Sequence, residues 1–428
     1  MISGACLSMK KEKRILRYAF TAFFLACLST GCSDDSDSKS STPPEVVAPT
    51  ALVDLAESVS AANGDRAVIL HVSTAGGTIW DVVAGKADVQ GDVDARLGDK
   101  VEIGSISKVF LAVTVLRLVE QGILGLDDPV SQWIDVAQLD ALTDGNGQLV
   151  RLRHLLNHAL GMGDYLNFAD DNTVLEFYGI TGERSYTPEE LIQQTIEITN
   201  NPVSQDPLYQ FPIFTPQDAE GNSYPDYDAI PFSWYSNTGY VMLGMIVQMV
   251  TGEPYEDMVR QEIIDPLGLE DTGFGTQGMQ SELTGYALGL EVSGEQPVVM
   301  SPTLSWSAGQ MISTTTDLGR FISAAINGEL FEDPATLSLW KEQYYKPLSK
   351  AIPYGLGIMR WEFDGVGTVF GHDGQVFSAV ALMAYEAGTG NVYTAAVNNS
   401  QYVSVDGDDA PSIWELFLKM RQIALENE

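Results

Sequence analysis

The pattern of apolar and polar positions predicts β-strands near both ends of the chain. Residues 67–73 and 78–84 are β-like runs on either side of Gly76-Gly77, which is typical of a β-hairpin. Near the other end the pattern again becomes β-like, and a predicted helix over residues 413–425 follows it. The strands predicted there cover residues 354–361, 367–372, 377–385 and 391–398.

Other segments have the helical spacing of apolar residues. An amphipathic helix is predicted for residues 52–62, before the hairpin. Residues 105–121 form a long apolar run that ends at Gly122, and residues 240–250 form a second run that ends at Gly252. The first run is apolar on almost every face, so we expect a buried helix there.

A capping signal predicts one more helix in the middle of the chain. Thr187 is a suitable N-cap residue, Pro188 follows at the first helical position, and Glu190 stands where a capping box needs an acidic side chain. We therefore expect a helix from this signal to about residue 198.

A long irregular loop is predicted over residues 201–230. The segment is rich in Pro, Asp and Tyr and shows no sustained period. Loops of this length usually serve as functional lids or are disordered. Its aromatic side chains either line a substrate cleft or pin the loop to the fold.

Strands at both ends with helices between them predict the fold class α/β (α+β). We expect one antiparallel sheet built from the N- and C-terminal segments, flanked by helices, with a mostly helical middle subdomain. The whole of residues 51–428 is predicted to form a single domain.

The start of the chain has the pattern of an export signal. Five basic residues within the first 17 positions precede an apolar stretch over residues 18–28 that is too short to span a bilayer. The sequence Leu-Ser-Thr-Gly-Cys then ends at Cys32, so residues 1–31 are predicted to be a signal peptide. This ending resembles a bacterial lipobox, in which the Cys is lipidated, and it implies lipid attachment at Cys32. The Leu stands four places before the Cys instead of the usual three, and an ordinary cleaved signal peptide is the alternative.

Residues 32–50 are predicted to be a disordered tether. They are rich in Ser, Asp and Pro and contain few large apolar side chains. Together with the signal this predicts an exported chain, a periplasmic or cell-envelope lipoprotein that touches the membrane through its lipid anchor only.

The charge of the chain excludes one large class of partners. Its formal net charge is −35, and no basic block follows the first 17 positions. Nucleic acids are bound through clustered Lys and Arg, so no nucleic-acid partner is expected. An acidic surface favours solubility and repels anionic partners.

Neither thiol chemistry nor a metal site is expected. All three cysteines lie within the first 32 residues, so the body has no thiol nucleophile and no disulfide. The four histidines include no HExxH motif. His154 and His158 lie four residues apart but have no third ligand in sight, so packing and capping roles are expected for both. No cofactor is expected, and oxygen nucleophiles or carboxylates must supply the chemistry.

Ser105 and Lys108 are the first candidate pair for catalysis. Positions i and i+3 share a face of a helix, so the hydroxyl and the amine can meet. The N-terminus of this helix favours a developing oxyanion. Burial disfavours the ammonium form, which would allow the lysine to act as a base near neutral pH. Ser-x-x-Lys also occurs at Ser8 and Ser36, but only Ser105 opens a buried helix after a turn glycine.

Two further motifs extend the constellation. Tyr235-Ser236-Asn237 directly precedes a predicted helix, and His372-Asp373-Gly374 lies between two predicted strands. With these residues in view the chain resembles the serine β-lactamase and penicillin-binding protein superfamily, most of all its branch of class C β-lactamases, DD-peptidases and related esterases. The resemblance covers about residues 50–428 and implies a β-lactamase/transpeptidase-like fold. It includes three further stretches, residues 150–158, 265–269 and 307–311.

The resemblance implies roles for the first two motifs. Ser105 would be the acylated nucleophile and Lys108 its proton partner. Tyr235 would act as a base or proton relay, with its phenolate favoured by the Lys108 cation. Asn237 would bind the Lys108 amine and an amide of the substrate.

The third motif would bind the substrate. The resemblance assigns this role to His372, Asp373, Gly374 and Gln375, and it places the oxyanion hole at the backbone N–H groups of Ser105 and Gln375.

The third motif departs from the pattern of the family. Many members have Lys-Thr-Gly, and the His of others can supply a hydrogen bond or partial positive charge. Asp373 replaces a Thr whose hydroxyl helps to bind the substrate carboxylate. A carboxylate there repels such a substrate unless it turns away or is neutralised, which favours an ester or an amide with a free amine. Alternatively, Asp373 points outward or pairs with a neighbouring cation.

These residues predict a serine hydrolase that forms an acyl-enzyme on Ser105. The preferred activity is D-alanyl-D-alanine carboxypeptidase or D-peptidase-like amide hydrolysis, on a small-molecule or peptide substrate such as a cell-wall peptide. A carboxylesterase or a class C-type β-lactamase on the same fold is the alternative. A slowly deacylating penicillin sensor or a wall-binding module is the alternative of another class. An α/β-hydrolase would need Gly-x-Ser-x-Gly, which the chain lacks.

Overall fold

The computed structural model describes residues 47–143, 145–160, 162–166, 184–200, 235–285, 301–342, 354–400 and 413–428. The predicted signal peptide, Cys32 and the predicted irregular loop over residues 201–230 lie outside the described residues. The chain divides into a segment Met1–Glu45 and a compact unit Val46–Glu428, and all the described residues belong to the second.

The main sheet joins the two ends of the compact unit, as the strand pattern predicts. It has six antiparallel strands in the order β2-β1-β11-β10-β9-β8. The N-terminal strand β1 therefore pairs with β11, with Val68 opposite Val397 and Ser73 opposite Val392. The strands are β1 (Val68–Ser73), β2 (Ile79–Ala84), β8 (Met359–Phe363), β9 (Gly367–Gln375), β10 (Val380–Glu386) and β11 (Val392–Val397).

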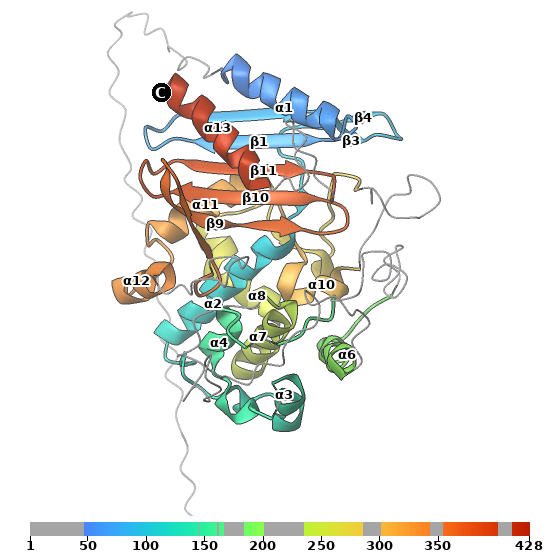
Figure 1. Ribbon diagram of the computed structural model, residues 1–428, viewed down its shortest axis with the longest axis vertical. Coiled ribbons are helices and arrows are strands. Elements are labelled where there is room, and N and C mark those ends of the chain that lie inside the picture. Colours follow the sequence, from blue (N-terminus) through green and yellow to red (C-terminus); the bar gives the residue numbers. More distant parts are fainter. Residues whose placement is uncertain are drawn as a thin grey trace, which may run out of the picture. The chain divides into compact units, whose positions relative to one another are not determined.

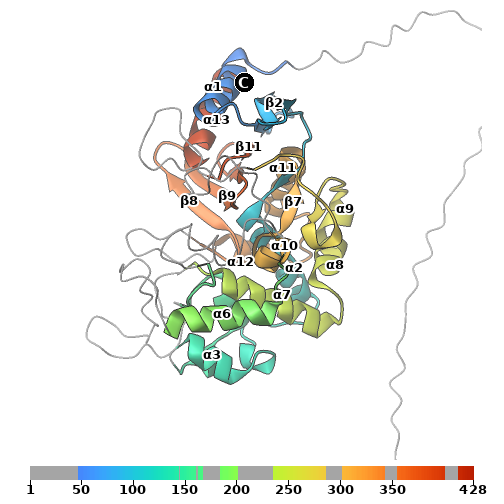
Figure 2. The same cartoon turned by 90° about the vertical axis from the view of Figure 1, so that its right-hand side faces the viewer.

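Helices cover both faces of this sheet. Successive side chains of a strand point to opposite faces, and along β1 Val68 and Leu70 pack into one cluster of apolar residues whereas Ile69 packs into another. The terminal helices α1 (Thr50–Ala62) and α13 (Ile413–Asn427) belong to the first cluster. On the other face lie α2 (Ser107–Glu120) and α11 (Thr315–Ile326), as the two views show (Figures 1 and 2).

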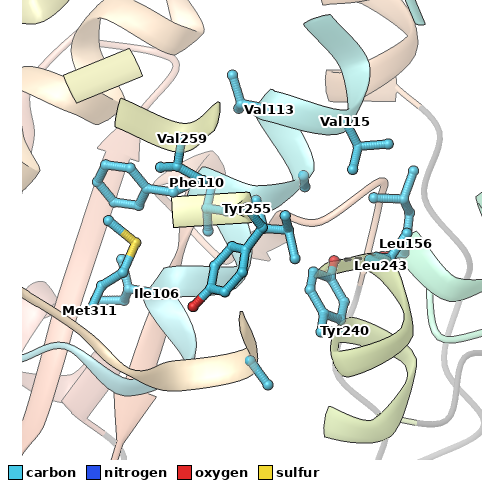
Figure 3. Packing of buried hydrophobic residues seen from close by; sticks show 14 of the residues in the cluster. Ile106, Phe110, Val113, Val115, Leu156, Tyr240, Leu243, Tyr255, Val259 and Met311 are labelled. Carbon is cyan, nitrogen blue, oxygen red and sulfur yellow. Dashed lines mark hydrogen bonds between the residues drawn. The ribbon is translucent and has the colours of Figure 1, made fainter. Parts of the chain in front are cut away.

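Helix α2 is buried along most of its length, as the apolar run predicts. The Phe110 ring stacks on Phe321 of α11, with 3.7 Å between the ring centroids. Figure 3 shows Phe110 and Ile106 on one side of α2, near Val259 and Met311. Truncating a buried Phe to Ala costs about 3–5 kcal/mol of stability, so this packing fixes the helix that carries Lys108.

The middle of the chain is mostly helical, and Figure 1 shows its helices gathered beyond the β9 side of the sheet. The capping box predicted at Thr187 is confirmed, since the Glu190 N–H donates to Thr187 Oγ1 at 3.2 Å and the Thr187 N–H donates to Glu190 Oε2 at 2.8 Å. These helices are α3 (Val136–Leu142), α4 (Leu152–Leu156), α6 (Pro188–Asn200), α7 (Asn237–Thr251), α8 (Tyr255–Val259), α9 (Asp265–Leu267), α10 (Pro302–Gly309) and α12 (Pro334–Glu342).

The first C-terminal strand differs from its prediction over residues 354–361. Tyr354 makes only an isolated bridge to Met359, where β8 begins. Between them Gly357 adopts a φ of +92°, and a Cβ there would lie 2.1 Å from the Ala112 Cβ on α2. The chain therefore turns tightly against α2 before it enters the sheet.

A small second sheet was not predicted. Its strands are only two or three residues long, too short to leave a period in the sequence. Their order is β5-β7-β6, and they are β5 (Val101–Glu102), β6 (Gly273–Phe274) and β7 (Met311–Ser313). Because β5 ends at Glu102 and pairs with β7, this sheet sets the approach to Ser105.

Candidate active site

Ser105 lies on a tight turn that leads into α2. The sequence predicts an α-helix from residue 105, but residues Gly104–Ile106 form a 3₁₀ turn and the α-helix begins at Ser107. Gly104 has a φ of +49°, and a Cβ there would lie 2.9 Å from the backbone nitrogen of Gln375. A glycine is therefore required for the turn to sit this close to β9.

Lys108 meets Ser105 as the i, i+3 spacing predicts. Its Nζ lies 3.0 Å from Ser105 Oγ, 2.6 Å from Asn237 Oδ1 and 2.7 Å from the carbonyl oxygen of Ala308. The last two atoms can only accept hydrogen bonds. A neutral amine can donate to both of them and keep its lone pair for the Ser105 hydroxyl proton. This arrangement is what a base acting on Ser105 needs.

The charge of Lys108 is set by burial. Its side chain is fully buried, and desolvation lowers the pKa of its amine from 10.5 to about 7. The carboxylates of Asp164 and Asp373 oppose this change and raise the pKa. Lys108 can therefore exchange its proton near neutral pH, as the apolar run around it predicts.

Tyr235 lies beside Lys108, with the Nζ 4.9 Å from the centroid of its ring. The expectation that the lysine favours a Tyr235 phenolate is wrong. Burial raises the pKa of Tyr235 well above 10, and although the Ser105 hydroxyl lowers it, nearby acidic groups including Asp373 raise it further. Tyr235 is thus a neutral phenol at rest, able to give and take back a proton.

Asn237 opens helix α7 and contacts the Lys108 amine, as the resemblance implies. Its backbone N–H donates to Asp164 Oδ2 at 2.5 Å. The preceding Ser236 N–H donates to His158 Nδ1 at 3.2 Å. No motif in the sequence pointed to Asp164, because its contact depends on a segment that lies 73 residues away along the chain.

Gly374 and Gln375 run directly past the turn at Ser105. A Cβ at Gly374 would lie 1.9 Å from the carbonyl oxygen of Ile103 and 3.1 Å from the backbone nitrogen of Ser105. The backbone segments that carry the N–H groups of Ser105 and Gln375 are therefore in contact, as an oxyanion hole built from them requires. The Gln375 side chain turns to the Ser400 carbonyl oxygen, to which Nε2 donates at 2.6 Å.

His372 is buried with both ring nitrogens engaged. Nδ1 donates to the carbonyl oxygen of Asp373, and Nε2 accepts from the Tyr354 hydroxyl at 2.9 Å. Burial lowers the pKa of His372 to about 3. The imidazole is therefore neutral, and the partial positive charge considered for it is absent. Through its contact with Tyr354, His372 helps to shape the site beside β9.

The Asp373 side chain is turned toward α13. Its Oδ1 accepts a hydrogen bond from Trp414 Nε1 at 3.0 Å. The alternative, in which Asp373 points outward or pairs with a cation, is wrong, because its carboxylate is bound to an indole N–H. Burial raises the pKa of Asp373, and its charge still acts on Lys108 and Tyr235. The usual Thr hydroxyl of this position is replaced by a carboxylate that the fold itself binds.

The two neighbouring histidines have the structural roles expected of them. The Arg151 N–H donates to His154 Nδ1 at 3.0 Å, which caps α4. The His158 ring packs against Tyr235, with 4.4 Å between the ring centroids.

Within the described ranges no cluster of three His, Cys, Asp or Glu side chains could hold a metal ion. No helix among these residues is long and apolar enough to cross a membrane.

The family model described as Beta-lactamase matches residues 54–416, which is most of the chain. The chain belongs to the Beta-lactamase family. The match takes in the turn at Ser105, the start of α7 and strand β9, so the superfamily resemblance drawn from the three motifs is confirmed.

Relatives and solved structures agree with this assignment. Penicillin-binding protein 4* of Bacillus subtilis (strain 168) is 25% identical over 291 residues, 64% of this chain and 55% of that protein. The D-amino acid amidase of Ochrobactrum anthropi SV3, in complex with L-phenylalanine amide, has a TM-score of 0.67 at 23% identity and covers 88% of this chain and 98% of that chain. The D-stereospecific amidohydrolase of a Streptomyces species has a TM-score of 0.63 at 25% identity and covers 85% and 96%.

These comparisons confirm the predicted fold class and the expectation of an enzyme of the serine hydrolase type. The chain spans about half the length of the curated relatives it matches.

Proposed function

We propose that this chain is a serine hydrolase that forms an acyl-enzyme on Ser105 and cleaves amide bonds of D-configured peptides or amino acid derivatives. The contact of a buried Lys108 amine with Ser105, Asn237 and Ala308 carries the proposal. A lysine with a pKa near 7 is a suitable base for a serine hydroxyl at neutral pH.

Acylation follows from these positions. Neutral Lys108 accepts the Ser105 proton while Oγ attacks the substrate carbonyl carbon, and the carbonyl oxygen becomes an oxyanion. The N–H groups of Ser105 and Gln375 stabilise that oxyanion, and each such donor contributes about 2.7–4 kcal/mol. Tyr235 gives its phenol proton to the leaving amine nitrogen and is reprotonated by the Lys108 ammonium. The C–N bond breaks and leaves the acyl group on Ser105.

Deacylation repeats these transfers with water as the nucleophile. Lys108 and Tyr235 are neutral again after the amine departs, so the pair can take a proton from water as hydroxide adds to the ester carbon. The tetrahedral intermediate collapses, the ester C–O bond breaks, and Ser105 recovers its proton. Both steps use the same oxyanion donors.

The third motif argues for the substrate class. Asp373 holds a carboxylate where the family has a Thr hydroxyl, and Trp414 binds it on the face of α13. With no hydroxyl there to bind a substrate carboxylate, an amide whose acyl part carries a free amine is favoured over a D-Ala-D-Ala terminus. The similarity to a D-stereospecific amidohydrolase supports an amide of D-configuration.

Intact-protein mass spectrometry tests the proposal. The protein is incubated with a fluorophosphonate and separately with a penicillin, and each adduct is mapped by peptide digestion. We expect a fluorophosphonate adduct on Ser105, together with turnover of D-alanine amide. A penicillin adduct on the same residue would point to a DD-peptidase-like pocket, and turnover of small esters alone would point to an esterase. A stable adduct with one acyl group per protein and no turnover would indicate a sensor instead of a hydrolase.

We also propose that the chain is exported and lipidated at Cys32. The basic residues, the short apolar stretch and the Cys after a small residue support this proposal. Metabolic labelling with a radioactive fatty acid tests it: the label is expected on the full chain and absent from Cys32→Ser. A secreted product without lipid would indicate an ordinary cleaved signal peptide.

A further inference from the structure

The Tyr235-Ser236-Asn237 motif is held in place by three residues that precede α6 in the chain, His158, Gly163 and Asp164. The Ser236 N–H donates to His158 Nδ1 at 3.2 Å, and Ser236 Oγ donates to the Gly163 carbonyl oxygen at 2.8 Å. The Asn237 N–H donates to Asp164 Oδ2 at 2.5 Å. These bonds fix the backbone at the point where the side chains of Tyr235 and Asn237 leave it.

Asp164 supplies a cap that α7 does not have in its own sequence. Ser236 is the N-cap residue, but it makes no capping bond with its side chain because the hydroxyl is given to Gly163. The Asp164 carboxylate stands at the helix N-terminus instead, where negative charge is favoured. Its other oxygen accepts the Leu166 N–H at 2.8 Å, so the carboxylate is fixed on both sides.

One residue separates this carboxylate from the Lys108 amine. Asn237 accepts from Lys108 through Oδ1 at 2.6 Å and donates to Asp164 through its backbone N–H. Asp164 is only 4% exposed, and burying a carboxylate is costly unless opposite charge or hydrogen bonds compensate. Burial raises the pKa of Asp164, whereas the backbone N–H groups of Asn237 and Leu166 and the Lys108 charge lower it and favour the carboxylate.

We propose that Asp164 is a positioning residue for the acyl-enzyme chemistry, which holds Asn237 and Lys108 against Ser105 and balances the positive charge that Lys108 gains during turnover. This inference rests on the proposed function. Acylation turns neutral Lys108 into an ammonium in a buried site, and a fixed carboxylate nearby lowers the free energy of that charged state.

The other groups around Lys108 do not combine negative charge with a hydrogen bond to a Lys108 partner, although the charge of Asp373 also raises the Lys108 pKa. Tyr235 and Tyr240 present their rings, 4.9 and 5.6 Å from Nζ, and burial raises the pKa of both phenols. His158 and His372 are buried, and their pKa values are lowered by burial and by the Lys108 charge. The remaining carboxylate, Asp373, is bound to Trp414. Among these neighbours only Asp164 is both acidic and bound to a Lys108 partner.

The rate of Ser105 labelling by a fluorophosphonate, measured across pH 5–10, tests the proposal on the full chain. The wild-type rate is expected to rise with pH as Lys108 loses its proton. Asp164→Asn removes one of the two carboxylate charges that raise the Lys108 pKa. In this variant the increase in labelling rate should occur about one pH unit lower, and the rate reached at high pH should fall about tenfold to a hundredfold.

Two further variants separate positioning from folding. Asp164→Glu keeps the charge but not the geometry, so its plateau should fall while the rise stays at the wild-type pH. Asp317→Asn is the matched control, because Asp317 also accepts a backbone N–H, from Asp271 at 3.2 Å, and lies outside this site, where it accepts the Thr272 hydroxyl at 2.8 Å as well. Its labelling should equal that of the wild type.

The outcomes distinguish failure of the role of Asp164 from failure of the proposed function. A folded Asp164→Asn whose labelling rises at the wild-type pH would overturn the charge-balancing role. If Asp164→Asn does not fold, a shifted rise in Asp164→Glu overturns it equally, since that variant retains the carboxylate. Absence of label on wild-type Ser105 at every pH would instead refute the proposed function, and the role of Asp164 with it.

Discussion

Gly374 packs against Ile103 so closely that a Cβ on the glycine would lie 1.9 Å from the Ile103 carbonyl oxygen. Strand β9 thus meets the nucleophile turn backbone to backbone, with no side chain between them. This contact brings Gln375 to Ser105, although the two residues lie 270 positions apart in the sequence.

Gly374→Ala is expected to separate the two oxyanion donors. The added methyl group must push β9 away from Ile103, and such overpacking costs about 1–3 kcal/mol of stability. The loss of one well-placed donor lowers the acylation rate by about a hundredfold to a thousandfold. Fluorophosphonate labelling measures that rate. Gly76→Ala is the control, because a Cβ there has its nearest neighbour at 3.6 Å and labelling should be unchanged. Normal labelling of Gly374→Ala would argue against an oxyanion hole at this contact.

Ser105→Ala is expected to abolish covalent labelling and to lower turnover of an amide substrate by several orders of magnitude. Only the hydroxyl bound to Lys108 is lost, so the circular dichroism spectrum and the melting temperature should stay close to those of the wild type. Turnover at the wild-type rate would rule out Ser105 as the nucleophile.

Lys108→Met tests the buried amine by its effect on stability. The pKa of Lys108 is about 7 in the fold and 10.5 as a free side chain, so between these values the unfolded chain binds more protons than the folded chain. The free energy of unfolding of the wild type, relative to Lys108→Met, should therefore rise with pH from about 7 to about 10, by at most about 1.36 kcal/mol per pH unit. Urea denaturation at several pH values measures it. A difference independent of pH would mean that Lys108 keeps its proton throughout.

Asp373→Thr tests the effect of charge on substrate choice. Removing the carboxylate should raise kcat/KM for a D-Ala-D-Ala peptide relative to D-alanine amide by about tenfold, because its charge opposes a substrate carboxylate. Trp414→Phe removes the indole hydrogen bond and leaves the carboxylate in place, so it should not raise this ratio. An unchanged ratio in Asp373→Thr would retire the idea of charge repulsion.

The sequence predicted those parts of the fold and site that depend on local pattern. The helix that carries Lys108 and the capping box at Thr187 and Glu190 follow from apolar spacing and cap chemistry, and the structure contains both. The contact of Ser105 with Lys108 follows from the i, i+3 spacing within one turn. Such features need no knowledge of distant residues.

Contacts between distant segments do not follow from local pattern. Asp164 meets Asn237, and Trp414 meets Asp373, only because the fold brings their segments together. The protonation of Tyr235 was wrongly predicted for the same reason. A neighbouring lysine suggested a phenolate, whereas the burial that raises its pKa comes from the whole surrounding fold.

The pairing of β1 with β11 has a consequence for biosynthesis. A ribosome completes Ser105 and Lys108 long before it reaches β9, and β1 gains its central neighbour only after β11 has been made. Before β9 is made the nucleophile lacks the Gln375 amide, and before β11 is made it lacks the complete sheet that supports it. The nascent chain is therefore expected to be inert toward its surroundings, and hydrolytic activity should begin only after β11 has been made.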